Sequence, residues 1–238
     1  MKIALLGYGK MGHAIEEIAL NKGHEIVLRI HDQNLNELTK HNIHKADVAI
    51  EFTNPLSAAD NILFCLNENI PVVCGTTGWL KQLKTIEDKC EEMNGAFLYA
   101  SNFSVGVNIF FELNKKLASL VKSHGTYDVS IEEIHHIEKK DAPSGTAITL
   151  AEQIIAVSDK KNNWINSDPQ KENELSIISK RTEQVAGTHS VKYVSAIDDI
   201  EIIHTAHSRK GFAEGAVLAA EFLSGKKGIF SMKDVLNF

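Results

Sequence analysis

The sequence of 238 residues has only three cysteines, four prolines and no long apolar run. Cys65, Cys74 and Cys90 are odd in number and lack the spacing of a metal site or a disulfide framework, so we expect reduced core thiols and a cytoplasmic protein. No stretch approaches the ~20 apolar residues of a membrane-spanning helix. Met1 and Lys2 lead directly into an apolar strand pattern, so we expect no signal peptide.

The sequence also lacks a basic face. It has 25 basic and 31 acidic residues, a net charge of −6, and no run of lysine and arginine, so a nucleic-acid partner is not expected. A hydrophobic fraction of 43% and a charged fraction of 24% are ordinary for a globular protein, and the length suits one large domain or two small ones.

Strand and helix patterns alternate along the first hundred residues. Apolar strand patterns cover 2–6, 25–30, 47–52, 71–74 and 96–100, with helix patterns at 10–22, 56–67 and 80–93. This alternation is typical of an α/β fold with a doubly wound parallel sheet. The sequence therefore predicts a first domain over 1–102, which the final helix pattern at 212–224 rejoins, so that 210–238 belongs to it.

The pattern changes after residue 102. A long helix pattern at 105–122 precedes extended segments at 127–136, 175–181, 191–196 and 200–207. Strands that follow one another in this way favour antiparallel or mixed pairing. We expect an α+β domain with a mixed sheet over 103–209, in which the polar segment 159–174 forms a solvated loop.

A glycine motif follows the first strand pattern and opens the first helix pattern. It reads Gly7-Tyr8-Gly9-Lys10-Met11-Gly12, and in this context G-x-G-x-x-G is typical of a Rossmann-type site that holds a dinucleotide pyrophosphate at a helix N-terminus. A tight turn without a ligand is the alternative. His31 and Asp32 end the second strand, where an acid favours NADH; Arg29 and His31 could instead attract the 2′-phosphate of NADPH, so both cofactors are predicted.

The segment from Glu132 to Ala147, EEIHHIEKKDAPSGTA, gathers acid/base, cationic and anion-binding groups in sixteen residues. His135, His136 and Lys139 lie on a strand-to-loop transition. A helix that starts at Ser144 offers the backbone N–H groups near Gly145 and Thr146 to a carboxylate or phosphate. The residues themselves predict an anion site beside two imidazoles and an ammonium group.

These motifs resemble those of the 4-hydroxy-tetrahydrodipicolinate reductase family, also called dihydrodipicolinate reductases. The glycine turn and the loop above agree with the family, and so do four further blocks in the same order. Those blocks are Glu51-Phe52-Thr53, Gly75-Thr76-Thr77-Gly78, the segment ASNFSVGVN from Ala100, and Ser208-Arg209 with Phe212-Ala213 before Gly215-Ala216.

The resemblance implies NAD(P)H-dependent reduction of a cyclic imine dicarboxylate in diaminopimelate and lysine biosynthesis, by a homotetramer. It assigns His135 as general acid and Lys139 as electrostatic catalyst. The substrate-binding residues would be His136, Ser144, Gly145, Thr146 and Arg209. The nicotinamide end of the cofactor would meet Phe52, Thr53, Gly75, Thr76, Thr77, Ser101, Asn102 and Phe103. Asn54 stands where the family often has a basic residue, which removes one anion contact.

Three other interpretations compete with this one. A different Rossmann amino-acid dehydrogenase would not require the adjacent histidines, and a non-catalytic NAD(H)-sensing protein would not require an acid and a cation on one loop. A metal site among His135, His136, His189, His204 and His207 is disfavoured, because neighbouring strand residues diverge and no cysteine or paired carboxylate joins them. We expect no metal. Glu132, Glu133 and Glu138 are interpreted as solvated or bracing carboxylates.

Overall fold

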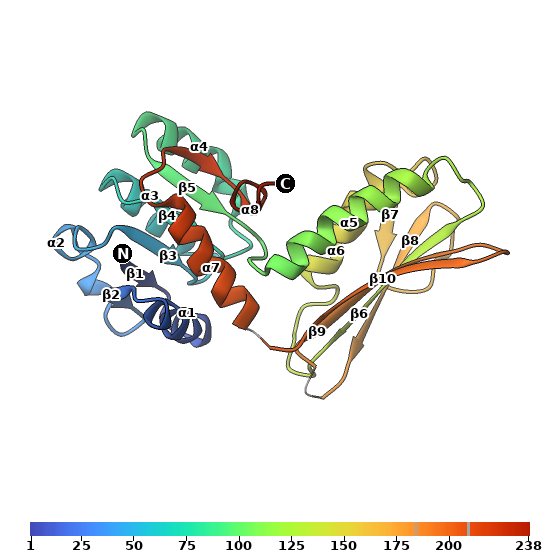
Figure 1. The fold of residues 1–238 in the computed structure, drawn as a ribbon, viewed down its shortest axis with the longest axis horizontal. Helices are drawn as coiled ribbons and strands as arrows, with labels where there is room; N and C mark the ends of the chain where they lie inside the picture. The colour runs from blue at the N-terminus through green and yellow to red at the C-terminus, as the bar shows by residue number, and fades with distance from the viewer. Residues whose placement is uncertain (184, 209) are drawn as a thin grey trace. The chain divides into compact units, whose positions relative to one another are not determined.

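The computed structural model describes residues 1–183, 185–208 and 210–238. The chain divides into two compact units: Met1–Val105 with Lys210–Phe238 forms unit 1, and Gly106–Arg209 forms unit 2 (Figure 1). Among the described residues, no helix is both long and apolar enough to span a membrane.

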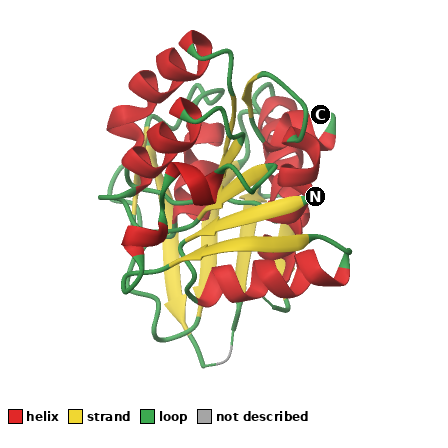
Figure 2. Cartoon of the chain, turned by 90° about the vertical axis from the view of Figure 1, so that its left-hand side faces the viewer, coloured by secondary structure: helices red, strands yellow, loops and turns green. Residues whose placement is uncertain are grey.

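Unit 1 contains a six-stranded sheet in the order β11-β5-β4-β3-β1-β2, and every neighbouring pair is parallel. Its strands are β1 (Lys2–Leu6), β2 (Glu25–Ile30), β3 (Val48–Glu51), β4 (Val72–Cys74), β5 (Ala96–Tyr99) and β11 (Gly228–Phe230). Its main helices are α1 (Lys10–Asn21), α3 (Ala58–Asn67), α4 (Leu83–Glu92) and α7 (Lys210–Leu223). The helices cover both faces of the sheet (Figure 2).

The central strands of unit 1 are continuously apolar because both of their faces are buried. In β1, Ile3 and Leu5 join the core under α1 and α7, whereas Ala4 and Leu6 join the core under α3 and α4. All four side chains are buried. The apolar residues are consecutive because helices pack on both faces of the sheet.

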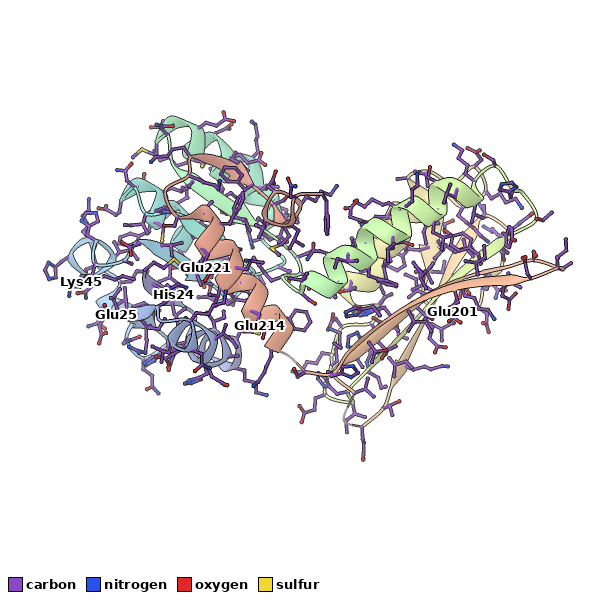
Figure 3. All side chains as sticks on the ribbon, viewed as in Figure 1. His24, Glu25, Lys45, Glu201, Glu214 and Glu221 are labelled. Atoms are coloured by element: carbon purple, nitrogen blue, oxygen red, sulfur yellow. The ribbon has the colours of Figure 1, made fainter. Side chains whose placement is uncertain are left out.

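Helix α7 brings the C-terminal part of the chain into unit 1. Its Glu221 accepts hydrogen bonds from the Lys22 ammonium group and contacts His24 Nε2, each at 2.8 Å; His24 and Glu221 are labelled in Figure 3. At Gly215 the helix lies so close to the backbone of Phe103 that a Cβ atom would be 1.8 Å from the Phe103 carbonyl oxygen. Glycine is therefore required at this crossing.

Unit 2 contains a mixed sheet in the order β10-β9-β6-β8-β7. The strands are β6 (Asp128–His135), β7 (Asn163–Ile165), β8 (Glu174–Arg181), β9 (Gly187–Val194) and β10 (Asp199–Ala206). β9 pairs antiparallel with β6 and β10, whereas β8 pairs parallel with β6 and β7. Helices α5 (Val105–Val121) and α6 (Gly145–Ile155) pack their apolar stripes on one face of this sheet.

The predicted fold class, a doubly wound parallel sheet plus a mixed sheet, is confirmed. The segment 159–174 differs from its prediction, since Asn163–Ile165 forms edge strand β7 against β8. Sequence patterns also did not identify β11, the short helices α2 (Lys40–Ile43) and α8 (Met232–Leu236), or the 3-10 turns η1 (Leu35–Glu37) and η2 (Leu80–Gln82). Elements of three to five residues are too short to show a period of 2 or 3.6.

Candidate active site

The glycine turn of unit 1 is shaped by close backbone approaches. Gly7 has φ +98°, and a Cβ there would be 2.2 Å from the Phe52 carbonyl oxygen. A Cβ on Gly12 would be 2.6 Å from the Gly7 oxygen, whereas one on Gly9 would enter open space. Gly9 caps α1 without any side-chain hydrogen bond. The helix N-terminus, which begins with Lys10 and Met11, is therefore accessible to an anion across Gly9.

A cleft of about 590 Å³ opens beside this turn, a volume typical of small-molecule sites. It is lined by the glycine turn, by the ends of β2 and β3, and by the start of α3, and His31, Asp32, Phe52 and Thr53 all contribute to its wall. Asp32 is exposed to the cleft. The structure thus places Gly7, Gly9, His31 and Asp32 around one cleft, and their contacts with a cofactor stay a prediction.

Arg29 is paired with Glu16 and lies over Tyr8. Its Nε donates to Glu16 Oε1 at 2.9 Å, its Nη2 also contacts Glu16, and its guanidinium lies 5.9 Å from the ring centre of Tyr8. The hydrogen bond from Arg29 lowers the pKa of Glu16 despite the opposing effect of its burial. The positive charge of Arg29 is consequently balanced by Glu16.

A buried carboxylate organises the ends of β3 and β4. Glu51 is fully buried and accepts hydrogen bonds from the Thr53 backbone N–H at 2.9 Å, the Thr53 hydroxyl and the Cys74 thiol at 3.1 Å. These bonds fix Thr53 at the rim of the cleft. A Cβ on Gly75 would be 2.2 Å from the tip of the Phe52 ring, so glycine lets that ring approach the backbone after β4.

The remaining predicted cofactor residues differ in exposure. Ser101 and Thr77 are exposed, and Asn102 is half-buried with its Oδ1 accepting from the Ser104 N–H at 2.9 Å. Phe103 is buried, and its ring lies 5.6 Å from that of Phe52, so its side chain supports Phe52 from the core. Thr76 is also buried, and its hydroxyl has no hydrogen-bond partner within the described residues.

In unit 2 the alternation along β6 places Glu133 and His135 on the buried face of the sheet. His135 Nε2 lies 3.3 Å from His189 Nε2 on β9 and 3.5 Å from Glu133 Oε2. The two imidazole rings meet edge to face, with centres 5.0 Å apart. His136 follows the end of the strand and is half-buried. The predicted acid therefore sits in a polar cluster inside the unit.

Donors surround the Glu133 carboxylate. The Ser144 N–H lies 3.1 and 3.0 Å from its two oxygens, the Ser179 hydroxyl donates at 2.7 Å, and the Arg181 guanidinium is 3.6 Å away. Burial alone would raise the pKa of Glu133, but hydrogen bonds from His135, Ser144 and Ser179 hold it well below its usual range. Burial, with the neighbouring His135, lowers the pKa of His189 to about 3. Glu133 is thus ionised and His189 neutral at neutral pH.

Sequence reasoning missed the roles of Glu133 and His189. The interpretation of Glu133 as a solvated carboxylate is wrong, because it is fully buried, whereas the bracing role fits its contacts. The period-2 pattern of Val129, Ile131, Glu133 and His135 was the available signal, since alternate strand residues share one face. His189 gave no local signal, because only the pairing of β9 with β6 brings it near.

The loop after β6 leads to the start of α6 at Gly145, as predicted. The Ser144 hydroxyl caps this helix by accepting from the Ala147 N–H at 3.2 Å, and it also lies 3.1 Å from His189 Nε2. Ser144 is buried, whereas Gly145 is exposed and Thr146 is half-buried. The first turn of α6 thus offers its N–H groups next to the imidazole cluster.

Lys139 is held within this loop. Its Nζ lies 2.8 and 2.9 Å from the two carboxylate oxygens of Asp141, and Arg181 donates to the carbonyl oxygens of Lys139 at 3.3 Å and Asp141 at 2.6 Å. Through these contacts Asp141 braces the loop. Arg209, the remaining predicted substrate residue, lies outside the described residues.

The expectation that no carboxylate joins the histidines is wrong. A carboxylate does join the histidines, since one ligand atom from each of Glu133, His135 and His189 lies within 4.8 Å of the others. Arg181, however, places a positive charge 3.6 Å from that carboxylate, and Ser144 and Ser179 already donate to it. A second cation there would be repelled, so the expectation of no metal stays a prediction.

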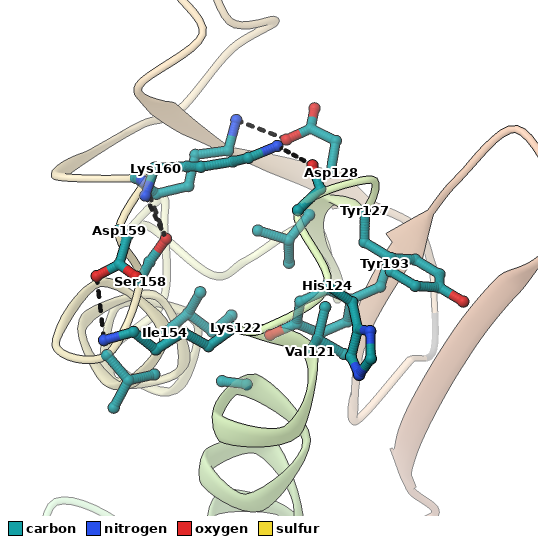
Figure 4. Close-up of a pocket in the computed structure, with 15 residues that line it drawn as sticks. Val121, Lys122, His124, Tyr127, Asp128, Ile154, Ser158, Asp159, Lys160 and Tyr193 are labelled. Atoms are coloured by element: carbon teal, nitrogen blue, oxygen red, sulfur yellow. Dashed lines mark hydrogen bonds and ion pairs between the residues drawn. The ribbon is translucent and has the colours of Figure 1, made fainter.

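A small hollow in unit 2 lies at the end of β6 that is opposite His135 (Figure 4). It measures only about 60 Å³ and is bounded by ion pairs between Lys161 and Asp128 at 2.7 Å and between Lys122 and Asp159 at 3.0 Å. This volume is too small for a dinucleotide or a ring dicarboxylate. The chemistry-bearing residues of unit 2 gather around His135 instead.

A Rossmann-type unit with an open glycine turn, together with a unit that carries a buried acid/base cluster, defines a nicotinamide-dependent oxidoreductase. Comparison with known proteins identifies the particular family. The sequence model for the dihydrodipicolinate reductase N-terminus matches residues 1–103, and the model for the dihydrodipicolinate reductase C-terminus matches residues 106–236. The chain belongs to the dihydrodipicolinate reductase family, and it is an NAD(P)H-dependent enzyme of the reduction step in diaminopimelate and lysine biosynthesis.

Relatives and solved structures agree with this assignment. The chain is 53% identical over its full length, and over 98% of the relative, to a 4-hydroxy-tetrahydrodipicolinate reductase of Christiangramia forsetii. It is 36% identical over 98% of its length to the enzyme of that name from Methanocaldococcus jannaschii, of which it covers 81%. Its fold matches a dipicolinate-bound dihydrodipicolinate reductase from Paenisporosarcina with a TM-score of 0.77 and 24% identity, covering 98% of each chain.

Proposed function

We propose that His135 is the general acid and Lys139 the electrostatic catalyst in the reduction of 4-hydroxy-tetrahydrodipicolinate to tetrahydrodipicolinate. The observation that supports this proposal most directly is the placement of His135. Its ring is anchored between Glu133 and His189, at the strand end that leads into the Lys139 loop and the N-terminus of α6. One loop thus carries a proton donor, a cation and an anion-binding helix end.

The reaction demands these three groups. The substrate loses its hydroxyl group as water, NADH or NADPH gives a hydride to the ring carbon, and the resulting enamine takes up a proton. An imidazole titrates near neutral pH and can supply that proton. An ammonium group at Lys139 would stabilise the negative charge that develops on the ring, once it exchanges its contact with Asp141 for the substrate.

The substrate carboxylates have a matching environment in unit 2. The N–H groups at the first turn of α6, with the Gly145 backbone and the Thr146 hydroxyl, are suited to one carboxylate. His136, Ser144 and Arg209 complete the proposed substrate-binding set. Gly145 supports this assignment because a ligand can approach its exposed backbone without a side chain in the way.

The cofactor belongs to unit 1 in this proposal. The pyrophosphate would lie on the glycine turn formed by Gly7, Gly9, Lys10, Met11 and Gly12, and the ribose beside His31 and Asp32. The nicotinamide would lie near Phe52, Thr53, Gly75, Thr76, Thr77, Ser101, Asn102 and Phe103. The cleft beside the turn has the volume for such a ligand. Asp32 favours NADH, and the pairing of Arg29 with Glu16 removes a direct attraction for a 2′-phosphate.

Oxidation of NADH or NADPH by purified protein and freshly made substrate tests this proposal. We expect turnover with both cofactors. His135→Ala should lower kcat by about 100-fold or more, because general acid–base catalysis contributes about 10²–10⁴-fold. Lys139→Ala should also lower kcat by about 100-fold or more, because one electrostatic group in the transition state contributes about 10²–10³-fold. Lys140→Ala is the matched control, since Lys140 is an exposed lysine of the same loop.

Two results would contradict the proposal. Full activity in both the His135→Ala and Lys139→Ala variants would show that other residues carry these roles. Binding of NADH by calorimetry without any turnover in the wild type would favour the sensing protein or a different amino-acid dehydrogenase. Tests with amino acids and NAD⁺ would then separate these two alternatives.

The proposal extends to location and assembly. A cytoplasmic enzyme is consistent with three free, buried cysteines, and burial raises the pKa of both the Cys65 and Cys74 thiols, which keeps them unreactive. Unit 2 would bind substrate and assemble a homotetramer through the sheet face that its helices leave open. The exposure of Ile203 on β10, at 59%, supports this face as the surface of assembly.

A further inference from the structure

One ring nitrogen of His135 is fully engaged inside unit 2. Nε2 lies 3.5 Å from Glu133 Oε2 and 3.3 Å from His189 Nε2. The opposite edge of the ring faces Gly187, where an added Cβ would be 2.9 Å from Cε1 and 3.2 Å from Nδ1. Nδ1 itself has no hydrogen bond to any of the described residues. The two nitrogens of this imidazole therefore have different environments.

The hydrogen bonds around Nε2 determine where the proton lies. An ionised carboxylate only accepts, and Glu133 is kept ionised by the donors from Ser144 and Ser179. His135 must then carry a hydrogen on Nε2. The Ser144 oxygen accepts from the Ala147 N–H and lies 3.1 Å from His189 Nε2, so its hydroxyl hydrogen is within reach of that nitrogen. Because His135 carries its hydrogen on Nε2, the His189 Nε2 that lies 3.3 Å away is the acceptor of this pair.

We propose that Glu133 and His189 are positioning residues that hold His135 in its Nε2–H tautomer, so that Nδ1 is the atom that delivers the proton to the reduced substrate. Gly187 permits this orientation because any side chain there would push the ring out of place. The arrangement follows the logic of other enzymes in which a buried carboxylate orients a catalytic imidazole. Neither residue touches substrate in this scheme.

This inference rests on the proposed function and deepens it. The imidazolium of His135 carries hydrogen on both nitrogens, and the hydrogen on Nδ1 passes to the enamine carbon after hydride transfer. NAD(P)⁺ is the oxidised product, the ring gains one hydride and one proton, and His135 returns to the neutral Nε2–H form until solvent reprotonates it. Glu133 remains ionised throughout and stabilises the imidazolium.

Several charged or titratable groups surround the two rings and enter any pH dependence. They are Glu133 on β6, Arg181 on β8, His204 on β10, and Lys139 with Asp141 on the loop after β6. Of these, Glu133 is the only anion in contact with His135. Its charge therefore faces the ring directly.

The first test is the pH profile of kcat/KM in Glu133→Gln. We expect kcat to fall by about 10²–10⁴-fold, with the KM for NADH unchanged, because general acid catalysis loses its oriented proton. The decreasing limb at high pH should move to lower pH, since the imidazolium loses its counter-charge. Glu133→Asp should restore part of the rate. Glu132→Gln should keep the wild-type profile, since Glu132 lies on the other face of β6 and pairs with Lys180.

The second test reads the tautomer directly and does not depend on turnover. ¹⁵N chemical shifts of histidine-labelled wild-type protein, assigned with His135→Gln, should show hydrogen on Nε2 and a bare Nδ1 above the pH at which His135 titrates. An Nδ1–H tautomer, or a pH limb that Glu133→Gln leaves unmoved, would overturn the inference. A wild type without turnover but with the Nε2–H tautomer would instead refute the proposed function alone.

Discussion

Glu133 shows how a single charged residue can be stable inside a protein. Its carboxylate is fully buried, yet backbone, hydroxyl and guanidinium groups surround it. A charge removed from water in this way is tolerated only when hydrogen bonds replace its hydration. Burial has the opposite consequence for His189: together with the neighbouring His135, it lowers the pKa of this histidine, which stays neutral.

The depressed pKa of His189 predicts acid lability of unit 2. In the unfolded chain His189 binds a proton near pH 6.5, whereas in the folded chain it does so only near pH 3. Between these values the unfolded state carries more protons, so stability falls as pH decreases, by roughly 1.4 kcal/mol for each pH unit. Glu133, whose folded pKa is also lowered, adds to this loss only below its unfolded pKa of 4.5.

The fluorescence of Trp164 can report the unfolding of unit 2 and so test this prediction. It packs against the core of unit 2, so a Trp79→Phe background leaves it as the only tryptophan. Urea unfolding of that protein should show a midpoint that decreases from pH 7.5 to pH 5.5. His189→Gln in the same background should decrease less over this interval. Equal decreases in both proteins would mean that His189 does not carry the acid sensitivity.

At the scale of elements, helix α7 offers two glycines in contrasting surroundings. A Cβ on Gly215 would meet the Phe103 carbonyl oxygen at 1.8 Å, whereas a Cβ on Gly211 would be 3.6 Å from the Ser104 hydroxyl, an ordinary contact. A Gly→Ala substitution at an open helix position stabilises the folded protein by up to about 1 kcal/mol. Close packing at Gly215 should reverse that gain.

We therefore expect Gly215→Ala to destabilise unit 1 by about 1–3 kcal/mol, the usual range for overpacking, because α7 must move away from the backbone at Phe103. Gly211→Ala should be neutral or slightly stabilising. Thermal unfolding of the two variants beside the wild type measures the difference. Similar melting temperatures for both variants would show that the helix adjusts without loss of packing.

The helices and strands differ in how far the sequence alone predicts them. The β1 strand and the α1 helix after Gly7 follow from an apolar run and a glycine motif, and α6 follows from Ser144 as its cap. Strand β7 has three residues within a polar segment and exists only because β8 pairs with it. The His135–His189 contact likewise depends on the register of β9 against β6, which one sequence does not encode locally.

At the scale of the whole molecule, the open face of the mixed sheet is the remaining surface to explain. The strand pairing aligns Ile203 on β10 with Ser190 on β9 and Glu132 on β6, while their neighbours Ile202, Val191 and Ile131 pack under the helices. Ile203 therefore faces away from the core and is 59% exposed. An exposed β-branched residue on an open sheet face suits contact with a second copy of the chain.

If the homotetramer forms through this face, light scattering of the wild type should give a mass near four times the 26.3 kDa of one chain. Ile203→Asp should shift the mass toward smaller species, because each symmetric contact would bury uncompensated carboxylates. Leu20→Asp is the control, since Leu20 is 51% exposed on α1 of unit 1. A tetramer that survives Ile203→Asp, or that Leu20→Asp disrupts equally, would place the interface elsewhere. Loss of NADH turnover together with the tetramer would further show that assembly supports the substrate loop of unit 2.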